Sequence, residues 1–181
     1  MKKVIVVISD GFEEIETITI IDVLRRANIE VTLVAIKTIT TSGAHNIKVE
    51  ADTLIGKINH NDFDMVVLPG GLPNAFNLAQ SSEVIKLLKD MQKSEKIIAA
   101  ICAAPYALHK AGVLNKNYTC YPSFEKKIRL QGYSSKHDVV IDDKVITSRG
   151  PGTAISFSLE LVKHLSNQDK YLQIKTELLI N

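Results

Sequence analysis

Short apolar runs alternate along the chain with amphipathic stretches. Four runs rich in Val and Ile lack the polar alternation of a half-exposed strand, and they predict buried parallel strands. They cover residues 4–8, 31–36, 65–68 and 97–101. The stretches between them include 14–27 and 83–91, which carry apolar side chains at helical spacing. This order predicts an α/β fold in which helices sandwich a doubly wound parallel sheet.

Each predicted helix has one apolar face that we expect to be buried. Two further helices are expected at 153–165 and 171–180. The expected buried positions are Ile15, Ile18, Ile21 and Leu24 or Arg25 in the first helix, Val84, Leu87, Leu88 and Met91 in the second, and Ile155, Leu159, Val162 and Leu165 at 153–165.

Two segments depart from the alternation of strand and helix. Residues 38–51 are rich in Thr, Ser and Gly, which predicts a small β-hairpin or an excursion off the main sheet. Residues 137–141 and 144–148 are β-prone runs around Asp142 and Asp143, which predicts a hairpin. No linker or repeat interrupts the 181 residues, so we expect a single domain over 1–181.

Composition excludes several classes of protein. Lys plus Arg number 22 and Asp plus Glu 20, spread along the chain, so no electrostatic footprint for nucleic acid is expected. The longest apolar stretch, 97–108, is well short of the about 20 residues that span a bilayer, so no membrane segment is expected. Two cysteines are too few for a disulfide scaffold, which favours a reducing cytoplasm. The spacing of His, Cys and acidic residues predicts no metal site.

Cys102 is the strongest candidate for chemistry. It ends the most apolar predicted strand, and small residues and Pro105 follow it, as at the start of a helix. A strand-to-helix turn would present the thiol at the carboxyl edge of the sheet, where the helix N-terminus favours the thiolate. The alternative is an inert, buried apolar residue.

Two other segments are expected at the same edge of the sheet. Gly70 and Gly71 follow the third predicted strand, where their N–H groups would face an oxyanion, unless they only form a tight turn. Glu16 lies about one turn into the first helix and could lean towards Cys102. A carboxyl group buried beside a thiolate should have a raised pKa and could carry a proton.

Four ordered segments together resemble the ThiJ/PfpI superfamily. They read GFEEIET at 11–17, LPGG at 68–71, AAICAAP at 99–105 and TSRGPGT at 147–153. The chain is most similar to the branch that contains the parkinsonism-associated deglycase and its bacterial homologues. The resemblance implies a flavodoxin-like fold, a homodimer, and no cofactor.

The resemblance also implies roles for individual residues. Cys102 would be the nucleophile and would oxidise to a sulfinate, and Glu16 would be its protonated partner. Gly70, Gly71 and Ala103 would supply backbone groups around the sulfur. A His directly after the cysteine is typical of the protease-like and chaperone-like branches, so Ala103 disfavours proteolysis.

The chain departs from the family pattern at Tyr121, where many members have a His near the cysteine. A phenol is a poor general base at neutral pH, so His-assisted hydrolysis is not expected, and Tyr121 is a candidate for orienting a substrate. The neighbouring Cys120 is either a second thiol of the site or a buried strand residue, and we favour the latter.

These residues and the resemblance together imply two candidate functions. The first is a cysteine-dependent, cofactor-free glyoxalase or deglycase that acts on methylglyoxal or on glycated adducts, in which Cys102 adds to the aldehyde and Glu16 moves a proton. The second is a redox-sensing stress protein or chaperone-like binding protein, in which oxidation of Cys102 is the signal and turnover is incidental. The expected partners are a small aldehyde or glycated substrate and a second copy of the chain.

Overall fold

The main sheet has seven strands in the order β5-β2-β1-β6-β7-β9-β8, and only the last pair, β8 and β9, is antiparallel. The computed structural model describes residues 1–180. The strands are β1 (Lys3–Ile8), β2 (Glu30–Ala35), β5 (Thr53–Leu54), β6 (Met65–Leu68), β7 (Ile97–Ile101), β8 (Val139–Asp142) and β9 (Val145–Ser148). The four apolar runs therefore form β1, β2, β6 and β7, and the predicted parallel sheet is confirmed.

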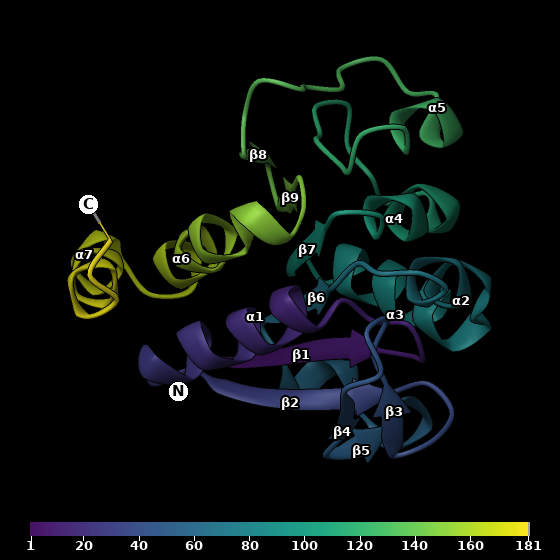
Figure 1. Ribbon diagram of the computed structural model, residues 1–181, viewed down its shortest axis with the longest axis horizontal. Coiled ribbons are helices and arrows are strands. Elements are labelled where there is room, and N and C mark those ends of the chain that lie inside the picture. Colours follow the sequence, from purple (N-terminus) through teal and green to yellow (C-terminus); the bar gives the residue numbers. More distant parts are fainter. Residues whose placement is uncertain (181) are drawn as a thin grey trace.

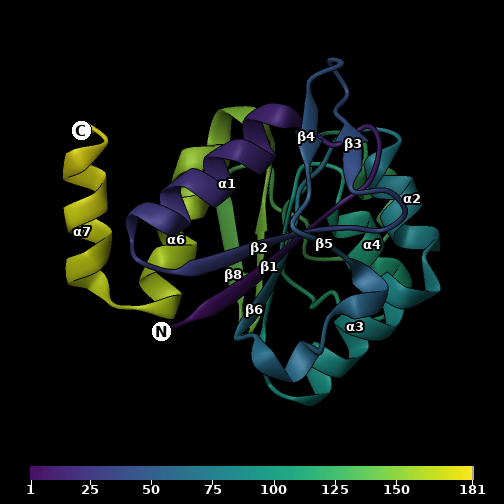
Figure 2. The ribbon, with the colours of Figure 1, turned by 90° about the horizontal axis from the view of Figure 1, so that it is seen from below.

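Helices cover both faces of this sheet (Figures 1 and 2). On one face, α1 packs against α6, and α7 packs outside α6. On the other face lie α2, α3 and α4. The helices are α1 (Glu14–Arg26), α2 (Asn74–Gln80), α3 (Ser82–Lys93), α4 (Pro105–Ala111), α5 (Glu125–Ile128), α6 (Ala154–Leu165) and α7 (Gln168–Glu177). In the part of the chain described, no helix has the length and apolar character needed to cross a membrane.

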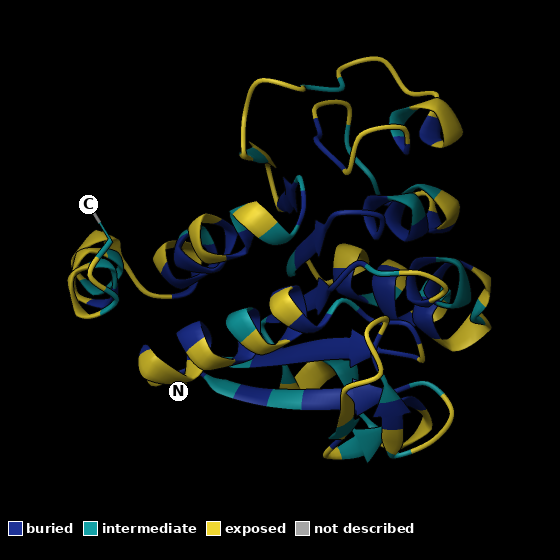
Figure 3. Cartoon of the chain, in the orientation of Figure 1, coloured by how far each residue is buried: buried dark blue, intermediate teal, exposed yellow. Residues whose placement is uncertain are grey.

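Successive residues of β1 bury their side chains in two separate cores. Val4, Val6 and Ile8 contribute to the core beneath α1 and α6. Ile5 and Val7 contribute to the core beneath α3 and α4. Both faces of the inner strands are therefore covered, as Figure 3 shows, which explains why the runs lack polar positions.

The predicted buried face is correct for α3 but partly wrong for α1 and α6. All four predicted positions of α3 are buried, and so are Ile21 and Leu24 of α1. In contrast, Ile15 and Ile18 are 58% and 48% exposed, and Ile155 of α6 is 44% exposed. The first turn of α1 instead buries its neighbours, Glu16 and Thr17. An apolar stripe on α1 therefore remains uncovered in the single chain.

Both predicted hairpins form. Strands β3 (Thr40–Ser42) and β4 (Lys48–Glu50) make a separate antiparallel pair, and β8 and β9 form the edge of the main sheet. The second turn lies one residue later than predicted, because Asp142 pairs with Val145 and Asp143 takes a left-handed conformation with φ of 54°. The edge strand β5 is short and pairs with β2 through two residues only. The remaining regular elements are three 3₁₀ turns, η1 (Ile55–Lys57), η2 (His60–Asp62) and η3 (Pro151–Thr153).

The C-terminal helix begins earlier than predicted. It starts at Gln168 rather than at 171, because the side chain of Asn167 accepts a hydrogen bond from Lys170 N and caps the helix. Neither α2 nor α5 was predicted, since both are short and lack a sustained helical period.

Candidate active site

Three loops that are distant in sequence meet at the carboxyl edge of the sheet. They follow β1, β6 and β7, which are adjacent in the order of the strands. Carboxyl ends of parallel strands in such a sheet are the usual place for a ligand site. The loops bring Cys102 and Gly70 against Glu16 of α1.

A sharp turn holds Cys102 directly after β7. Its φ is 64°, a left-handed conformation that is uncommon for a residue with a side chain. Cys102 N donates to Ser148 O at 3.0 Å, and Cys102 O accepts from Tyr121 N at 2.8 Å. These two bonds fix the turn, and the residue is 8% exposed. The predicted strand-to-helix turn is therefore present, with α4 beginning at Pro105.

Glu16 is fully buried beside this thiol. Its Oε2 accepts a hydrogen bond from Gly70 N at 2.7 Å, and its side chain is hydrogen-bonded to Cys102. Its Oε1 has no hydrogen-bond partner among the described residues. Burial raises the pKa of Glu16 from its ordinary 4.5 to about 7, although the bonds from Gly70 and Cys102 lower it. Glu16 is therefore able both to give and to take a proton at neutral pH.

The pKa of Cys102 departs from the sequence-based expectation. Burial raises the pKa of the thiol above its ordinary value, and the charge of Glu16 raises it further. Hydrogen bonds from Gly71 N and Ala103 N act in the opposite direction. The predicted helix-terminus effect is thus outweighed by burial next to a second acid. Because the two groups interact strongly, they titrate as a pair, and loss of one proton leaves a negative charge shared between them.

Of the three backbone groups expected around the sulfur, that of Gly70 has a different role. The Gly70 N–H is occupied by Glu16, so it fixes the carboxyl group rather than facing an open site. The donors to the sulfur are Gly71 N and Ala103 N. Gly71 has φ of 88°, and a Cβ there would lie 2.2 Å from Gly11 O, so this position requires glycine.

Tyr121 forms one wall of a shallow pocket. It is 47% exposed and lies against Gly150, where a Cβ would be 3.2 Å from Tyr121 Cδ2. The pocket has a volume of about 180 Å³ and is completed by Pro122, Arg149 and η3. The Tyr121 N bond to Cys102 O connects this wall to the cysteine turn.

Cys120 is a buried structural residue in an irregular segment, not in a strand. Burial raises its pKa to about 12, and its sulfur accepts a hydrogen bond from Glu125 N at the start of α5. Both cysteines are free thiols. The buried interpretation of Cys120 is therefore confirmed, while its assignment to a strand is wrong.

The spacing of residues in the sequence did not indicate a group of acidic and His side chains that lies next to the site. Glu14 Oε1 accepts from His45 N at 2.7 Å, and Glu14 Oε2 contacts His45 Nδ1 at 2.9 Å. With Glu13 these residues place three potential ligand atoms within 4.8 Å of one another, a group that could hold a metal ion. His45 lies 31 residues after Glu14, so no motif indicated it. The hydrogen bonds tie the β3–β4 turn to the start of α1, which accounts for the arrangement without an ion.

A family model described as the DJ-1/PfpI family matches residues 2–164. The chain is 38% identical to protein dj-1beta of Drosophila melanogaster, over 99% of this chain and 97% of that protein. It is 37% identical to protein DJ-1 homolog B of Arabidopsis thaliana, again over 99% of this chain but only 42% of that longer protein. A Caenorhabditis elegans relative named glutathione-independent glyoxalase DJR-1.2 is 36% identical over 87% of this chain and 85% of that protein.

Solved structures give the same result. The crystal structure of Drosophila melanogaster DJ-1beta has a TM-score of 0.96 at 37% identity and covers 99% of this chain and 98% of that chain. A structure of Toxoplasma gondii DJ-1, described as oxidized, has a TM-score of 0.92 at 34% identity and covers 99% of each chain. The likeness extends over the whole fold.

Replacing Glu16 by Gln should change how stability depends on pH. Between pH 4.5 and about 7 the folded protein retains a proton on Glu16 that the unfolded chain has lost, so wild-type stability falls as the pH rises. The difference between these two pKa values corresponds to about 3 kcal/mol. The free energy of unfolding of Glu16→Gln, measured by urea unfolding, should therefore rise by about 3 kcal/mol relative to that of the wild type between about pH 4 and pH 8.

The exposed carboxylate of Glu50 provides the matched control for this effect. Glu50→Gln removes the same charge without relieving any burial, so its stability relative to wild type should show no such trend. A Glu16→Gln difference that stayed constant across the pH range would contradict the raised pKa of Glu16.

Replacing Gly70 by Ala should disturb the contact between Glu16 and Cys102. A Cβ at Gly70 would lie 2.5 Å from Cys102 Cβ, 2.9 Å from its Sγ and 2.9 Å from Glu16 Oε2. Such overpacking costs about 1–3 kcal/mol of stability and should also slow alkylation of Cys102 by iodoacetamide. At Gly152 a Cβ would meet nothing within 4 Å, so Gly152→Ala should leave both quantities near wild type. Equal behaviour of the two variants would show that Gly70 does not enforce this packing.

Proposed function

The chain belongs to the DJ-1/PfpI family, and from this premise we propose that it is a cysteine-dependent, cofactor-free glyoxalase or deglycase acting on methylglyoxal or on glycated adducts. The observation that carries the proposal is the buried contact between the Cys102 thiol and Glu16, whose pKa lies near neutrality. The glyoxalase name of the Caenorhabditis elegans relative supports the same reaction class.

The first step is addition of the Cys102 sulfur to the aldehyde carbon of methylglyoxal, in the form of the pair that holds one proton, with the sulfur as thiolate and the proton on Glu16. A C–S bond forms, the C=O π bond opens, and Glu16 donates its proton to the new alkoxide, which gives a hemithioacetal. Glu16 is left as a carboxylate. The contact between Glu16 and Cys102 supports this transfer, since both groups would lie next to the aldehyde carbon and its oxygen.

The next steps move one proton between adjacent carbons. Glu16 removes the proton from the carbon bound to sulfur, and an enediolate forms with its charge on the former ketone oxygen. The proton returns to the neighbouring carbon and the hydroxyl proton of the former aldehyde passes to the former ketone oxygen, which gives a lactoyl thioester. The former aldehyde carbon is oxidised and the former ketone carbon is reduced, so no external oxidant or reductant is needed. Water then cleaves the thioester, releases lactate and restores the thiol.

The surrounding groups fit these steps. Gly71 N and Ala103 N lie beside the sulfur, where they would stabilise the alkoxide and the tetrahedral intermediate of thioester hydrolysis. Gly70 holds Glu16 through its N–H. We assign Tyr121 to substrate orientation, because it borders the pocket next to the cysteine turn and is exposed.

The protein is also proposed to be a cytoplasmic homodimer. Ile15 and Ile18 are exposed on α1, next to the turn that contains the exposed Ile47. Glu14 holds that turn against α1, and α1 packs on α6, where Ile155 is exposed. This apolar stripe lies beside the candidate active site, and exposed apolar patches of this kind are typical of interfaces. A second copy of the chain would cover it.

A redox role is the second candidate function. The buried Oε1 of Glu16 has no partner among residues 1–180 and lies in the side chain that contacts Cys102. A protonated Glu16 could therefore bind an oxygen of a Cys102 sulfinate, and oxidation of Cys102 would then be the signal that a partner reads. The oxidized form of the similar Toxoplasma gondii protein supports this alternative.

Lactate formation from methylglyoxal tests the enzymatic proposal. In buffer containing a chelator, Glu16→Gln should reduce turnover by about 10²–10⁴-fold, the usual contribution of a general acid-base group. Cys102→Ser should abolish the reaction, because it removes the nucleophile. Cys120→Ser is the matched control, since this second thiol lies outside the site, and it should retain turnover.

Preparations must first be shown to lack contaminating glyoxalase. Unchanged turnover in both Cys102→Ser and Glu16→Gln would remove the basis of the proposal. No turnover in the native protein would favour the redox role, which intact mass after mild peroxide would then test through a gain of about two oxygens confined to Cys102.

A further inference from the structure

A large hollow lies between α2, α4 and α5, and it shares no lining residue with the pocket that Tyr121 borders. Its volume is about 840 Å³, within the range of about 300–1,000 Å³ that small-molecule sites occupy. In Figure 1, α4 lies between α5 and α2. The hollow is lined by Phe76 of α2, Tyr106 and His109 of α4, and Ser123, Lys126, Lys127, Ile128 and Arg129 in and around α5.

The floor of the hollow is a packed aromatic cluster. Phe76, Tyr106 and Phe124 have ring centroids 5.7–6.3 Å apart, and two of the three contacts are edge to face. Phe124 and Ile128 are buried, while Phe76 and Tyr106 are partly exposed to the hollow. This cluster supplies an apolar surface with little freedom to move, against which a planar group can pack.

The rim carries cations without carboxylate partners. Lys126, Lys127 and Arg129 line the hollow, and Lys110 lies over the Tyr106 ring at 5.4 Å. Lys127 lies over the Phe76 ring at 5.8 Å. Within residues 1–180, the ion pairs shorter than 4.0 Å include none of these four cations, and no Asp or Glu lines the hollow.

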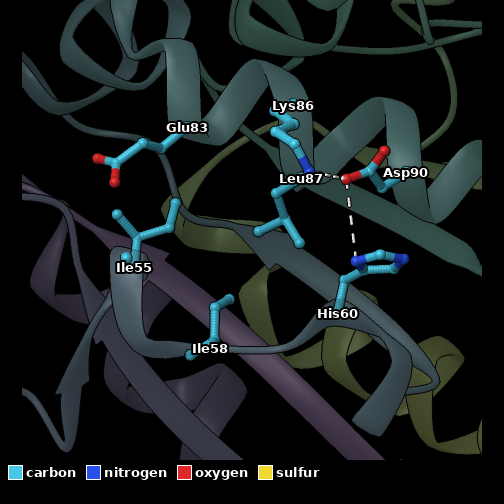
Figure 4. A pocket seen from close by; sticks show the side chains of 8 residues that line it. Ile55, Ile58, His60, Glu83, Lys86, Leu87 and Asp90 are labelled. Carbon is cyan, nitrogen blue, oxygen red and sulfur yellow. Dashed lines mark hydrogen bonds and ion pairs between the residues drawn. The ribbon is translucent and has the colours of Figure 1, made fainter.

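His109, which also lines the hollow, is affected both by burial and by one of these cations. Burial lowers its pKa, and the charge of Lys110 lowers it further. The pocket in Figure 4 provides the contrast, because there Asp90 pairs with Lys86 at 2.7 Å and with His60 at 3.8 Å. Lys86 in that pocket is thus paired with a carboxylate, whereas the cations around the hollow have no carboxylate partner among the described residues.

The segment that presents the cations is held in a defined shape. Residues at both ends of α5 have left-handed conformations, Ser123 with φ of 84° and Arg129 with φ of 59°. The sulfur of Cys120 accepts from Glu125 N at the start of the helix, and Arg129 Nε donates to Lys126 O at the end. A four-residue helix fixed in this way needs little further ordering of its backbone on binding.

We propose that this hollow is a binding site for a small molecule that carries both phosphate groups and a planar ring, such as a nucleoside diphosphate. Three unpaired cations on one short segment suit a multivalent anion better than a single carboxylate. Phe76 and Tyr106, which both line the hollow, suit the ring. A volume of about 840 Å³ is that of a small-molecule site, which favours a compact ligand over an extended polyanion.

Isothermal titration calorimetry of the full chain with ADP tests the site. Lys126→Gln/Lys127→Gln/Arg129→Gln should raise the Kd for ADP by about tenfold or more, because it removes the charge-assisted hydrogen bonds. Lys57→Gln/Lys89→Gln/Lys93→Gln is the matched control, which removes three exposed cations elsewhere and should leave the Kd within about twofold of wild type. Phe76→Leu should weaken ADP but not pyrophosphate, since only ADP has a ring.

Several outcomes would overturn the proposal. They are absence of ADP binding to the wild-type chain, an unchanged Kd in the first triple variant, an equal loss in the control triple variant, or pyrophosphate binding as tightly as ADP. Cys102→Ser should bind ADP as the wild type does, so failure of the proposed enzymatic function and failure of this site would be seen separately.

Discussion

The contact between the Glu16 carboxyl group and the Cys102 thiol is the constraint on which the candidate active site depends. Two acids cannot both be charged in a buried place without a large free-energy penalty, so they share one proton near neutral pH. That shared proton makes addition to a carbonyl feasible, because one form of the pair contains both the thiolate nucleophile and a protonated carboxyl group. The same contact gives the site a way to hold an oxidised sulfur, so both candidate functions begin from it.

The surrounding fold maintains this contact through backbone groups. Gly70 supplies a hydrogen bond to Glu16 and leaves room for both side chains, which a Cβ would fill. Cys102 keeps its left-handed turn because Ser148 O and Tyr121 N bond its backbone. Strand order then brings the three loops together, since β1, β6 and β7 are neighbours. A chain with the same side chains but another strand order would not place Glu16 beside Cys102.

The sequence predicts the parts of the structure that follow from local pattern. Uninterrupted apolar runs identify β6 and β7 to the residue, because strands buried on both faces need no polar positions. The position of Glu16 in the first turn of α1 also predicts correctly that it lies at the carboxyl edge of the sheet, beside Cys102.

The features that the sequence pattern does not predict depend on tertiary context. Ile15 and Ile18 have helical spacing but are exposed, because the first turn of α1 buries Glu16 and Thr17 instead. The pKa of Cys102 depends on burial next to Glu16, which spacing does not indicate. The four residues of α5 are too few for a periodic signal.

A carbon-13 NMR titration of the Glu16 carboxyl group tests the central claim most directly, with the resonance assigned by its loss in Glu16→Gln. The shared proton predicts a midpoint near pH 7 in the reduced protein, well above the ordinary value of 4.5. A midpoint near 4.5 would contradict the account, because Glu16 would then be charged at neutral pH and would have no proton to share with Cys102.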